Sequence, residues 1–319
     1  MKPSRLLLPA VAAAALLLPL LLPTKFALAI VAFIGFYSLA TLGLQLLMGY
    51  AGQISVGHAA FFGIGAYAYG ALTTRAGAPG WVALVGAAVL NAAIAWLIGR
   101  PIFRLRGPQL ALATLVLGII AGTVFMQAER LTGGALGMGE IPPLAIGGFA
   151  FNTDLRNAYL ALCVALAVLV LASNLMRYSP GRRLRALSAD ENVAASLGVD
   201  VGRHKLAVFV ASGVLTGLGG TLYASYLTYI SPDAFTFLLS VELLLMSVLG
   251  GMRSIWGAPL GAATVVLLVQ FLDYLSRHLP AGSDVILKSV VFGACLVLVI
   301  TFLPNGLAEI AARLRRGRP

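Results

Sequence analysis

The sequence predicts an all-α, polytopic membrane protein, and three observations lead to this fold class. Of the 319 residues, 60% are hydrophobic and only 10% are charged, with a mean hydropathy of +0.96. A soluble domain carries about 25% charged residues, so this composition excludes a single water-soluble globule. The apolar residues form runs that reach the roughly 20 residues of a spanning helix, and no segment shows the alternating pattern of a membrane barrel.

The apolar runs predict about ten transmembrane helices, each near the length that the bilayer requires. Helices are expected because open sheet edges cannot exist in lipid. No Pro/Ser-rich linker divides the chain, so we expect one membrane domain over residues 1–319, with one long basic connection at 177–205. The predicted spans cover residues 6–23, 26–48, 56–73, 81–99, 109–128, 157–176, 206–230, 237–250, 257–275 and 285–303.

The basic residues predict the orientation of these helices. The chain has 22 Lys and Arg against 11 Asp and Glu, a net charge of +11. Nucleic-acid binding needs a hydrophilic basic face, which this sequence lacks, so no nucleic-acid partner is expected. With the N-terminus inside, alternate connections hold 16 basic residues inside and 6 outside. The positive-inside rule then predicts that both termini lie in the cytoplasm. We expect the chain to be a multi-pass protein of the cell (inner) membrane.

The first apolar run has two interpretations. Lys2, Arg5 and the Ala27-Leu28-Ala29 sequence are similar to a cleavable signal peptide. Cleavage after Ala29 would truncate the second span, and the apolar run is longer than a normal signal core. We therefore favour an uncleaved first helix.

The chain lacks a nucleotide-binding motif of its own. The four lysines follow Met1, Thr24, His204 and Leu287, so none completes the Gly-Lys pair of a Walker A loop. Three scattered histidines and two cysteines in apolar runs offer no metal spacing and no cluster of catalytic groups. We expect no metal site, no cofactor and no enzymatic activity in this chain.

Few ionisable residues fall within the predicted spans. Glu242 and Lys288 lie at similar depths near the outer surface, and we expect either an ion pair between them or separate snorkelling to the interface. A midplane ion site, which a secondary transporter would need, is not evident.

The inside connection contains a short predicted helix over residues 189–197. Ser188 followed three residues later by Glu191 fits a capping box, Asp190 adds negative charge at the helix start, and Gly198 is a natural terminator. So short a helix needs a surface to lie against. Its small-residue face fits a groove on another protein, and anionic lipid headgroups beside the upstream arginines are the alternative.

The same loop resembles a known family. Glu191, Ala194, Ala195 and Gly198 match the coupling-helix motif of ABC importer permeases. More specifically, the chain resembles branched-chain amino-acid permeases of the LivM type over nearly its whole length. Arg253 and Asn305 depart from the usual pattern. The matching stretches are residues 49–67, 105–107 with 111–115, 132–134, 188–198 and 248–261.

The resemblance implies one permease subunit of an ATP-driven importer for branched-chain or related small amino acids, with urea and other amides as alternative substrates. It implies a second homologous permease, two ATP-binding subunits that hold ATP and Mg²⁺, and an extracytoplasmic solute-binding protein. Residues 188–198 would contact the ATP-binding subunit. The alternative function is an ion-coupled secondary transporter of small polar solutes.

Small residues recur at helical spacing on three predicted spans. Such stripes let helix backbones approach closely in lipid, and we favour this packing role over substrate contact. The members of these stripes that we single out are Gly63, Gly70, Gly213, Gly217, Gly257 and Gly261.

A few polar residues are candidates for the translocation path. Gln53, Ser55 and His58 could line its inner mouth, or Ser55 could cap the following helix. At the outer side, Thr132 and Gly133 begin a glycine-rich loop that could serve as a gate or an ordinary turn. Glu242, near the outer surface of its predicted span, is a further candidate for the path.

Overall fold

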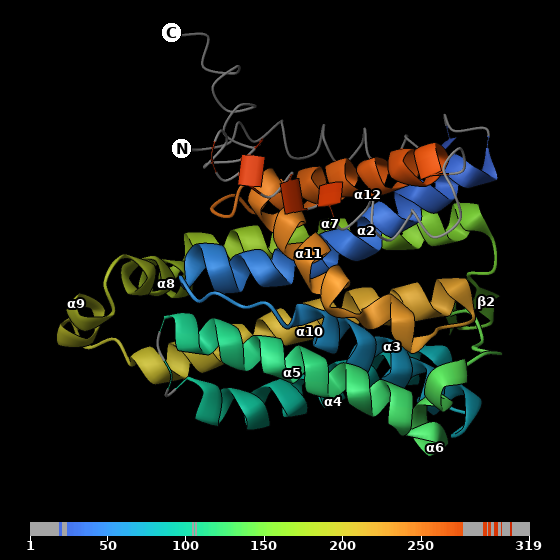
Figure 1. Cartoon of the computed structure of the whole chain (residues 1–319), viewed down its shortest axis with the longest axis horizontal. Helices are drawn as coiled ribbons and strands as arrows, with labels where there is room; N and C mark the ends of the chain where they lie inside the picture. The colour runs from blue at the N-terminus through green and yellow to red at the C-terminus, as the bar shows by residue number, and fades with distance from the viewer. Residues whose placement is uncertain are drawn as a thin grey trace, which may run out of the picture.

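The fold is a bundle of helices that run between two ends of the molecule (Figure 1). The computed structural model describes residues 19–20, 24–103, 105 and 107–276, with the separate residues 290, 291, 293, 294, 297, 298, 301 and 307. The longer helices are α2 (Lys25–Gln45), α3 (His58–Thr74), α4 (Gly80–Ile102), α5 (Pro108–Gln127), α7 (Asp154–Arg177), α10 (Val201–Leu227), α11 (Phe237–Gly250) and α12 (Gly257–Ser276).

Shorter elements connect these helices. A π-helical turn, Leu46–Tyr50, continues α2, and 3₁₀ turns cover Gly134–Leu136 and Pro232–Phe235. The remaining elements are α6 (Glu129–Thr132), α8 (Ser179–Ala189), α9 (Glu191–Ser196), β1 (Ala145–Ile146) and β2 (Phe149–Ala150).

Eight of the predicted spans coincide with helices. Within the described residues, six helices are long and apolar enough to cross a membrane, whereas α3 and α11 are shorter at 17 and 14 residues. The predicted spans 6–23 and 285–303 lie largely outside the described residues. The helical membrane architecture is therefore confirmed, and the count of ten is not.

The described residues also contain one small β-hairpin, which the sequence did not predict. Strands β1 and β2 form an antiparallel hairpin in which Ala145 pairs with Ala150. Gly147 and Gly148 form its two-residue turn with φ of +58° and +85°. Two consecutive residues with positive φ are what a tight hairpin turn requires, and glycine supplies them without steric cost.

Helix α10 lies among α2, α3 and α4, and glycines let the backbones meet there. A Cβ built on Gly65 of α3 would lie 2.0 Å from the Gly217 carbonyl oxygen of α10. A Cβ on Gly220 would lie 1.9 Å from the Phe62 carbonyl oxygen. Neither position can hold a side chain, so small residues fix the α3–α10 contact.

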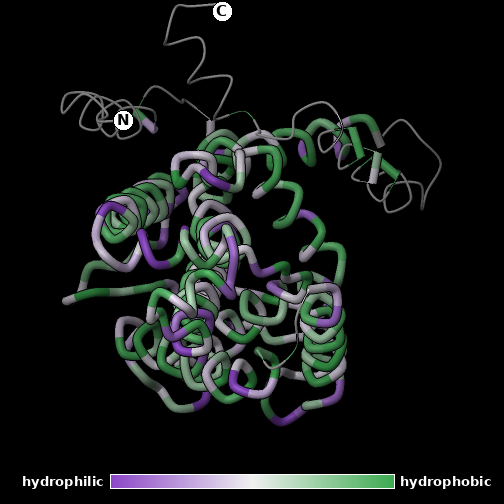
Figure 2. Tube along the Cα trace, turned by 90° about the vertical axis from the view of Figure 1, so that its left-hand side faces the viewer, coloured by the Kyte–Doolittle hydropathy of each residue, from purple (hydrophilic) through white to green (hydrophobic). Residues whose placement is uncertain are grey.

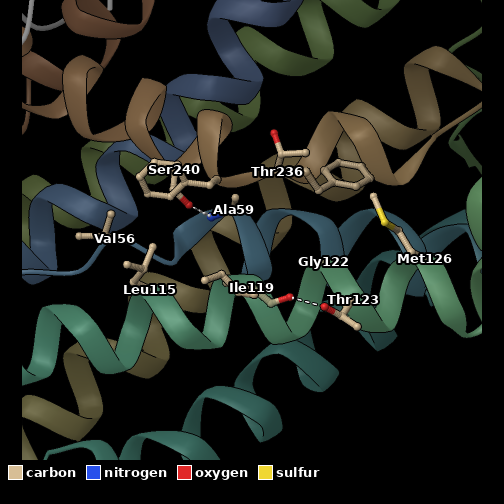
Figure 3. A pocket seen from close by; sticks show the side chains of 12 residues that line it. Val56, Ala59, Leu115, Ile119, Gly122, Thr123, Met126, Thr236 and Ser240 are labelled. Atoms are coloured by element: carbon tan, nitrogen blue, oxygen red, sulfur yellow. Dashed lines mark hydrogen bonds between the residues drawn. The ribbon is translucent and has the colours of Figure 1, made fainter. Parts of the chain in front are cut away.

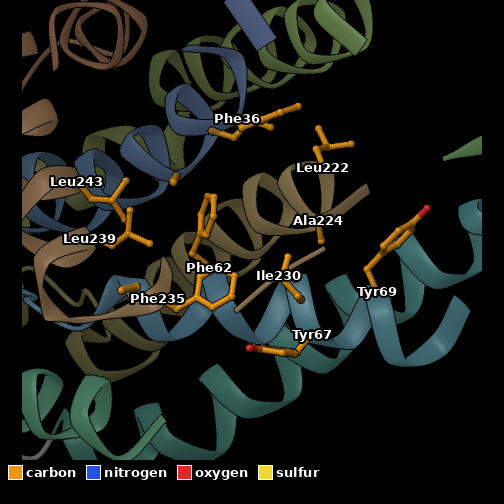
Figure 4. Packing of buried hydrophobic residues seen from close by; sticks show 14 of the residues in the cluster. Phe36, Phe62, Tyr67, Tyr69, Leu222, Ala224, Ile230, Phe235, Leu239 and Leu243 are labelled. Carbon is orange, nitrogen blue, oxygen red and sulfur yellow. The ribbon is translucent and has the colours of Figure 1, made fainter. Parts of the chain in front are cut away.

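Aromatic side chains fill the space around this contact (Figure 4). The ring centroid of Phe62 lies 5.4 Å from that of Tyr223 and 6.1 Å from that of Phe235. Phe235 also lies 5.5 Å from Tyr67. These rings join α3, α10 and the segment before α11 into one core.

The two ends of the bundle differ in charge and in structure. One end carries α8 and α9, and the other carries α6 and the hairpin (Figure 1). Figure 2 faces the α9 end and shows hydrophilic residues among mainly hydrophobic helices. Described basic residues at the α9 end are Arg100, Arg177, Arg182, Arg183, Arg185, Arg203, Lys205 and Arg253, against Lys25, Arg75, Arg130 and Arg156 at the other.

Candidate functional site: helix α9 and the segment beneath it

Helix α9 begins at a different cap from the one predicted. Asp190 is the N-cap: its Oδ1 accepts hydrogen bonds from the Asn192 and Val193 amides at 2.8 and 3.1 Å. Ser188 lies inside α8 and donates to the Arg185 carbonyl. The capping box of Ser188 and Glu191 is therefore wrong, because α8 continues through Ala189 and occupies the predicted start of the helix.

Helix α9 is also shorter than the predicted 189–197 segment and stands apart from the bundle (Figure 1). Gly198 follows it with φ of +81°, the left-handed conformation of a helix terminator. Ala194 is buried, whereas Ala195 is exposed. Val193 and Leu197 are 55% and 74% exposed. Two aliphatic side chains thus lie on the outer surface of a projecting helix.

Glu191 points back from α9 toward the bundle. Its carboxylate forms a salt bridge with Lys205 of α10. The Nε2 of Gln53 donates to the same carboxylate oxygen at 3.1 Å. Lys205 and Gln53 are 3% and 5% exposed. The glutamate of the predicted coupling motif is thus held by two buried side chains of the membrane bundle, and we refer to Gln53, Glu191 and Lys205 as the α9 cluster.

Gln53 belongs to residues 49–59, which we call the junction segment. At its centre, Gly52 has φ of +67°, and a Cβ there would lie 3.3 Å from the Ser188 Cα. The junction segment therefore passes directly beneath the α8–α9 turn. Gln53 is held in place because its Nε2 also donates to the Ala51 carbonyl at 3.0 Å.

Glycines at both ends of the junction segment meet other backbones. A Cβ on Gly49 would lie 1.7 Å from the Met252 carbonyl oxygen, in the α11–α12 turn. A Cβ on Gly57 would lie 1.9 Å from the Thr114 carbonyl oxygen of α5. The many glycines of this stretch are thus explained by close contacts on two sides.

Ser55 is not the cap of α3, contrary to one expectation, because the helix begins at His58 with Gly57 at the cap position. The Ser55 hydroxyl instead shares a 2.8 Å hydrogen bond with the Nδ1 of His58. The Nε2 of His58 lies 2.6 Å from the Ser212 hydroxyl of α10. All three side chains are buried, so they tie the start of α3 to α10.

Side chains of two other helices bind backbone amides at the start of α3. The Val56 amide donates to the Thr114 hydroxyl of α5, and the Ala59 amide donates to the Ser240 hydroxyl of α11, both at 3.1 Å. These pairings could not be predicted from the sequence, because Thr114 and Ser240 lie 58 and 181 positions from their partners.

A groove of about 220 Å³ adjoins these hydrogen bonds, between α3, α5 and α11 (Figure 3). Ser240 and Thr236 line one side, and Thr123 donates to the Ile119 carbonyl on the other. The rest of the lining is apolar and resembles any helix contact in the sequence, which is why sequence analysis missed it. The lining residues are Val56, Ala59, Leu115, Gly118, Ile119, Gly122, Thr123, Met126, Phe235, Thr236, Phe237 and Ser240.

Thr132 and Gly133 lie at the opposite end of the molecule, apart from the groove lining. The Thr132 hydroxyl donates to the Phe125 carbonyl at 2.7 Å. A Cβ on Gly133 would lie 1.9 Å from the Gly137 carbonyl oxygen. Met138 and Ile230 exchange two backbone hydrogen bonds of 2.8 and 2.9 Å just beyond. This loop is compact and is paired with the connection between α10 and α11.

Glu242 lies on α11 and is partly buried. Its predicted partner Lys288 lies outside the described residues. Both expectations, an ion pair with Lys288 and separate snorkelling to the interface, therefore stay predictions.

The singled-out glycines lie at contacts between segments. A Cβ on each would approach the following neighbours: Phe125 at 2.4 Å for Gly63, Met138 at 2.7 Å for Gly70, Ala95 and Phe61 at 3.2 Å for Gly213, Asn91 at 2.3 Å for Gly217, the Gly250 carbonyl at 2.3 Å for Gly257 and the Met246 carbonyl at 1.8 Å for Gly261.

Within the part of the chain that the structure describes, no three His, Cys, Asp or Glu side chains gather as a metal site would require. The side chains of the α9 cluster and the groove include one carboxylate, one amine, one amide and several hydroxyls. Such groups can position a solute or transmit movement between helices.

Comparison with known proteins shows which sequences this chain is similar to. Residues 26–300 match the family described as the permease component of the branched-chain amino acid transport system. The permease LivM of the high-affinity system is 31% identical in Escherichia coli K12 and 30% identical in Salmonella typhimurium, in each case over 85% of this chain and 67% of the relative.

A further relative is the permease LivH of the high-affinity branched-chain amino acid transport system in Escherichia coli K12. It is 28% identical over 85% of this chain and 90% of the LivH chain. These relatives are transport permeases, and the family match covers most of the helices described above. The chain belongs to the branched-chain amino acid transport system permease family.

Proposed function

We propose that this chain is one membrane-spanning permease subunit of an ATP-driven importer of branched-chain or related small amino acids. In this proposal it works beside a second homologous permease. Two ATP-binding subunits, which carry ATP and Mg²⁺, lie at the α9 end, and a solute-binding protein docks at the opposite end. The names of the relatives support the substrate class, and the two relatives LivM and LivH support a paired permease.

The observation that carries the proposal is the surface of α9. This helix projects from the end that holds most of the described arginines, and its exposed Val193 and Leu197 form a small apolar face. Exposed aliphatic side chains on a short helix favour insertion into a groove on another protein. In the proposal, that groove belongs to an ATP-binding subunit.

The charge distribution supports the orientation. The α9 end would face the cytoplasm because basic residues collect there, and the hairpin end would face outward. The host membrane would then be the inner membrane, with both termini inside.

The groove between α3, α5 and α11 is the proposed wall of the translocation path. Its apolar lining matches a branched aliphatic side chain, and Ser240, Thr236 and Thr123 offer hydroxyl groups at its edge. In the proposal, the exposed Leu112, Val116 and Ile120 of α5 face the second permease or the surrounding lipid.

The proposal is tested with Leu197→Asp in the complete complex. A charge on the apolar face should weaken binding of the ATP-binding subunits about tenfold or more, because the free energy needed to bury an unpaired charge at the interface opposes binding. Co-purification of the subunits and ATP-dependent leucine uptake in vesicles provide the readouts.

Leu136→Asp, a change at the 85% exposed leucine of the opposite end, is the control and should leave ATPase binding intact. Normal ATPase binding by Leu197→Asp, with binding to anionic vesicles impaired instead, would favour the lipid-contact alternative. Uptake of leucine that continues without ATP would favour the ion-coupled transporter.

A further inference from the structure

The α9 cluster connects a projecting helix to the interior of the bundle. Glu191 lies at the first position of α9, and both of its described partners are more than nine-tenths buried: Gln53 in the junction segment and Lys205 in α10. Displacement of α9 must therefore either move these partners or break charge-assisted hydrogen bonds, which are the stronger kind.

The junction segment extends from this cluster to the groove. Three positions after Gln53, the Val56 amide is hydrogen bonded to Thr114 of α5, and two residues further His58 is bonded to Ser212 of α10. Val56 itself lines the groove.

The last contact of the junction segment reaches α11. The Ala59 amide donates to the hydroxyl of Ser240, and both residues line the groove. The backbone between Gln53 and Ala59 has little room to move, because Gly57 is in close contact with the Thr114 carbonyl. Movement of Gln53 would therefore be transmitted to α5, α10 and α11 through hydrogen bonds made by the next six residues of the chain.

We propose that Gln53 is a positioning residue that transmits the movement of α9 to the groove, with the Glu191–Lys205 ion pair as its anchor. This inference rests on the proposed coupling of α9 to an ATP-binding subunit. It differs from that proposal in the role of Glu191, which links α9 to the bundle and does not contact the ATP-binding subunit. Coupling through a continuous chain of hydrogen bonds and packed backbone is a physical route between distant sites.

The test is Gln53→Ala in the complete complex reconstituted in vesicles. Gln53 is uncharged, so its removal leaves the Glu191–Lys205 pair in place. We expect normal co-purification of the ATP-binding subunits and normal basal ATP hydrolysis. The number of ATP molecules hydrolysed per leucine transported should rise about tenfold. This factor corresponds to the free energy of one hydrogen bond to a charged group, which the variant lacks.

Gln109→Ala is the matched control, because Gln109 is exposed at the same end of the molecule. A ratio of ATP to leucine that is unchanged in Gln53→Ala, or that rises equally in the control, would overturn the proposal. Absence of ATP-driven leucine uptake by the wild-type complex would instead overturn the proposed function, so the two failures are distinct.

A second experiment decides the matter if Gln53→Ala fails to assemble. Glu191→Lys and Lys205→Glu each place like charges together and should lower coupled uptake. The double variant restores an ion pair and should recover uptake above either single variant. No recovery, in a double variant that assembles or in one that does not, would contradict the anchoring role of the pair.

Discussion

At the scale of single residues, Asp190 decides where α9 begins. Its side chain accepts hydrogen bonds from two amides that no helical carbonyl could satisfy. The sequence contained this information, since aspartate is a strong N-cap, but a serine with a glutamate three residues later appeared to offer a fuller motif. The serine was unavailable because it lies within the preceding helix.

Loss of this cap should loosen α9 without affecting the bundle. Asp190→Ala is expected to lower the local stability of α9 by about 1 kcal/mol. The amides of Asn192 and Val193 should therefore exchange several-fold faster. Asp190→Asn keeps an acceptor and should exchange like the wild type. Hydrogen exchange measured by mass spectrometry on the 188–199 peptide checks both variants, and equal rates in all three proteins would show that another group holds the helix.

At the scale of elements, backbone contact between α3 and α10 determines how the bundle packs. The spans themselves follow from the apolar runs, and eight were located from the sequence because lipid demands their length and composition. The contacts between spans could not be predicted in the same way. Glycine spacing indicated which helix faces are small, but it did not indicate which helix each face meets.

Two glycine substitutions separate packing from transport. Gly220→Val places a side chain against the Phe62 carbonyl and should destabilise the protein by about 3 kcal/mol or more, beyond ordinary overpacking because backbone must move. A Cβ on Gly122 meets nothing within 4 Å and points to open space.

Gly122→Val should therefore leave the melting temperature in detergent unchanged. Gly122 nevertheless lines the groove, so this variant should reduce leucine uptake if the groove forms the path. Full uptake by Gly122→Val would remove the groove from the path, and a normal melting temperature of Gly220→Val would contradict the close α3–α10 contact.

At the scale of the whole molecule, charge asymmetry between the ends predicts the orientation. Described arginines concentrate at the α9 end, and from the positive-inside rule we predict that this end faces the cytoplasm. This prediction used only residue counts. The α9 cluster, by contrast, escaped sequence analysis, because Lys205 contributed to the basic count and nothing in its neighbourhood indicated burial beside Glu191.

Labelling of single cysteines in intact cells checks the orientation. In a background without Cys163 and Cys295, Leu136→Cys should react with a membrane-impermeant maleimide, and Leu197→Cys should react only after the membrane is opened. Both side chains are strongly exposed, so access depends on the side of the membrane. The reverse pattern would invert the topology and remove α9 from the cytoplasm.

The pairing of residues 138–141 with 228–230 restricts how the groove could widen. Three backbone hydrogen bonds, two between Met138 and Ile230 and one from Ile141 to Thr228, join the stretch after α5 to the stretch before α11. Parting the two helices at that end would break all three. Widening of the groove therefore costs least free energy when the two helices pivot about this hydrogen-bonded end and separate most beside the junction segment.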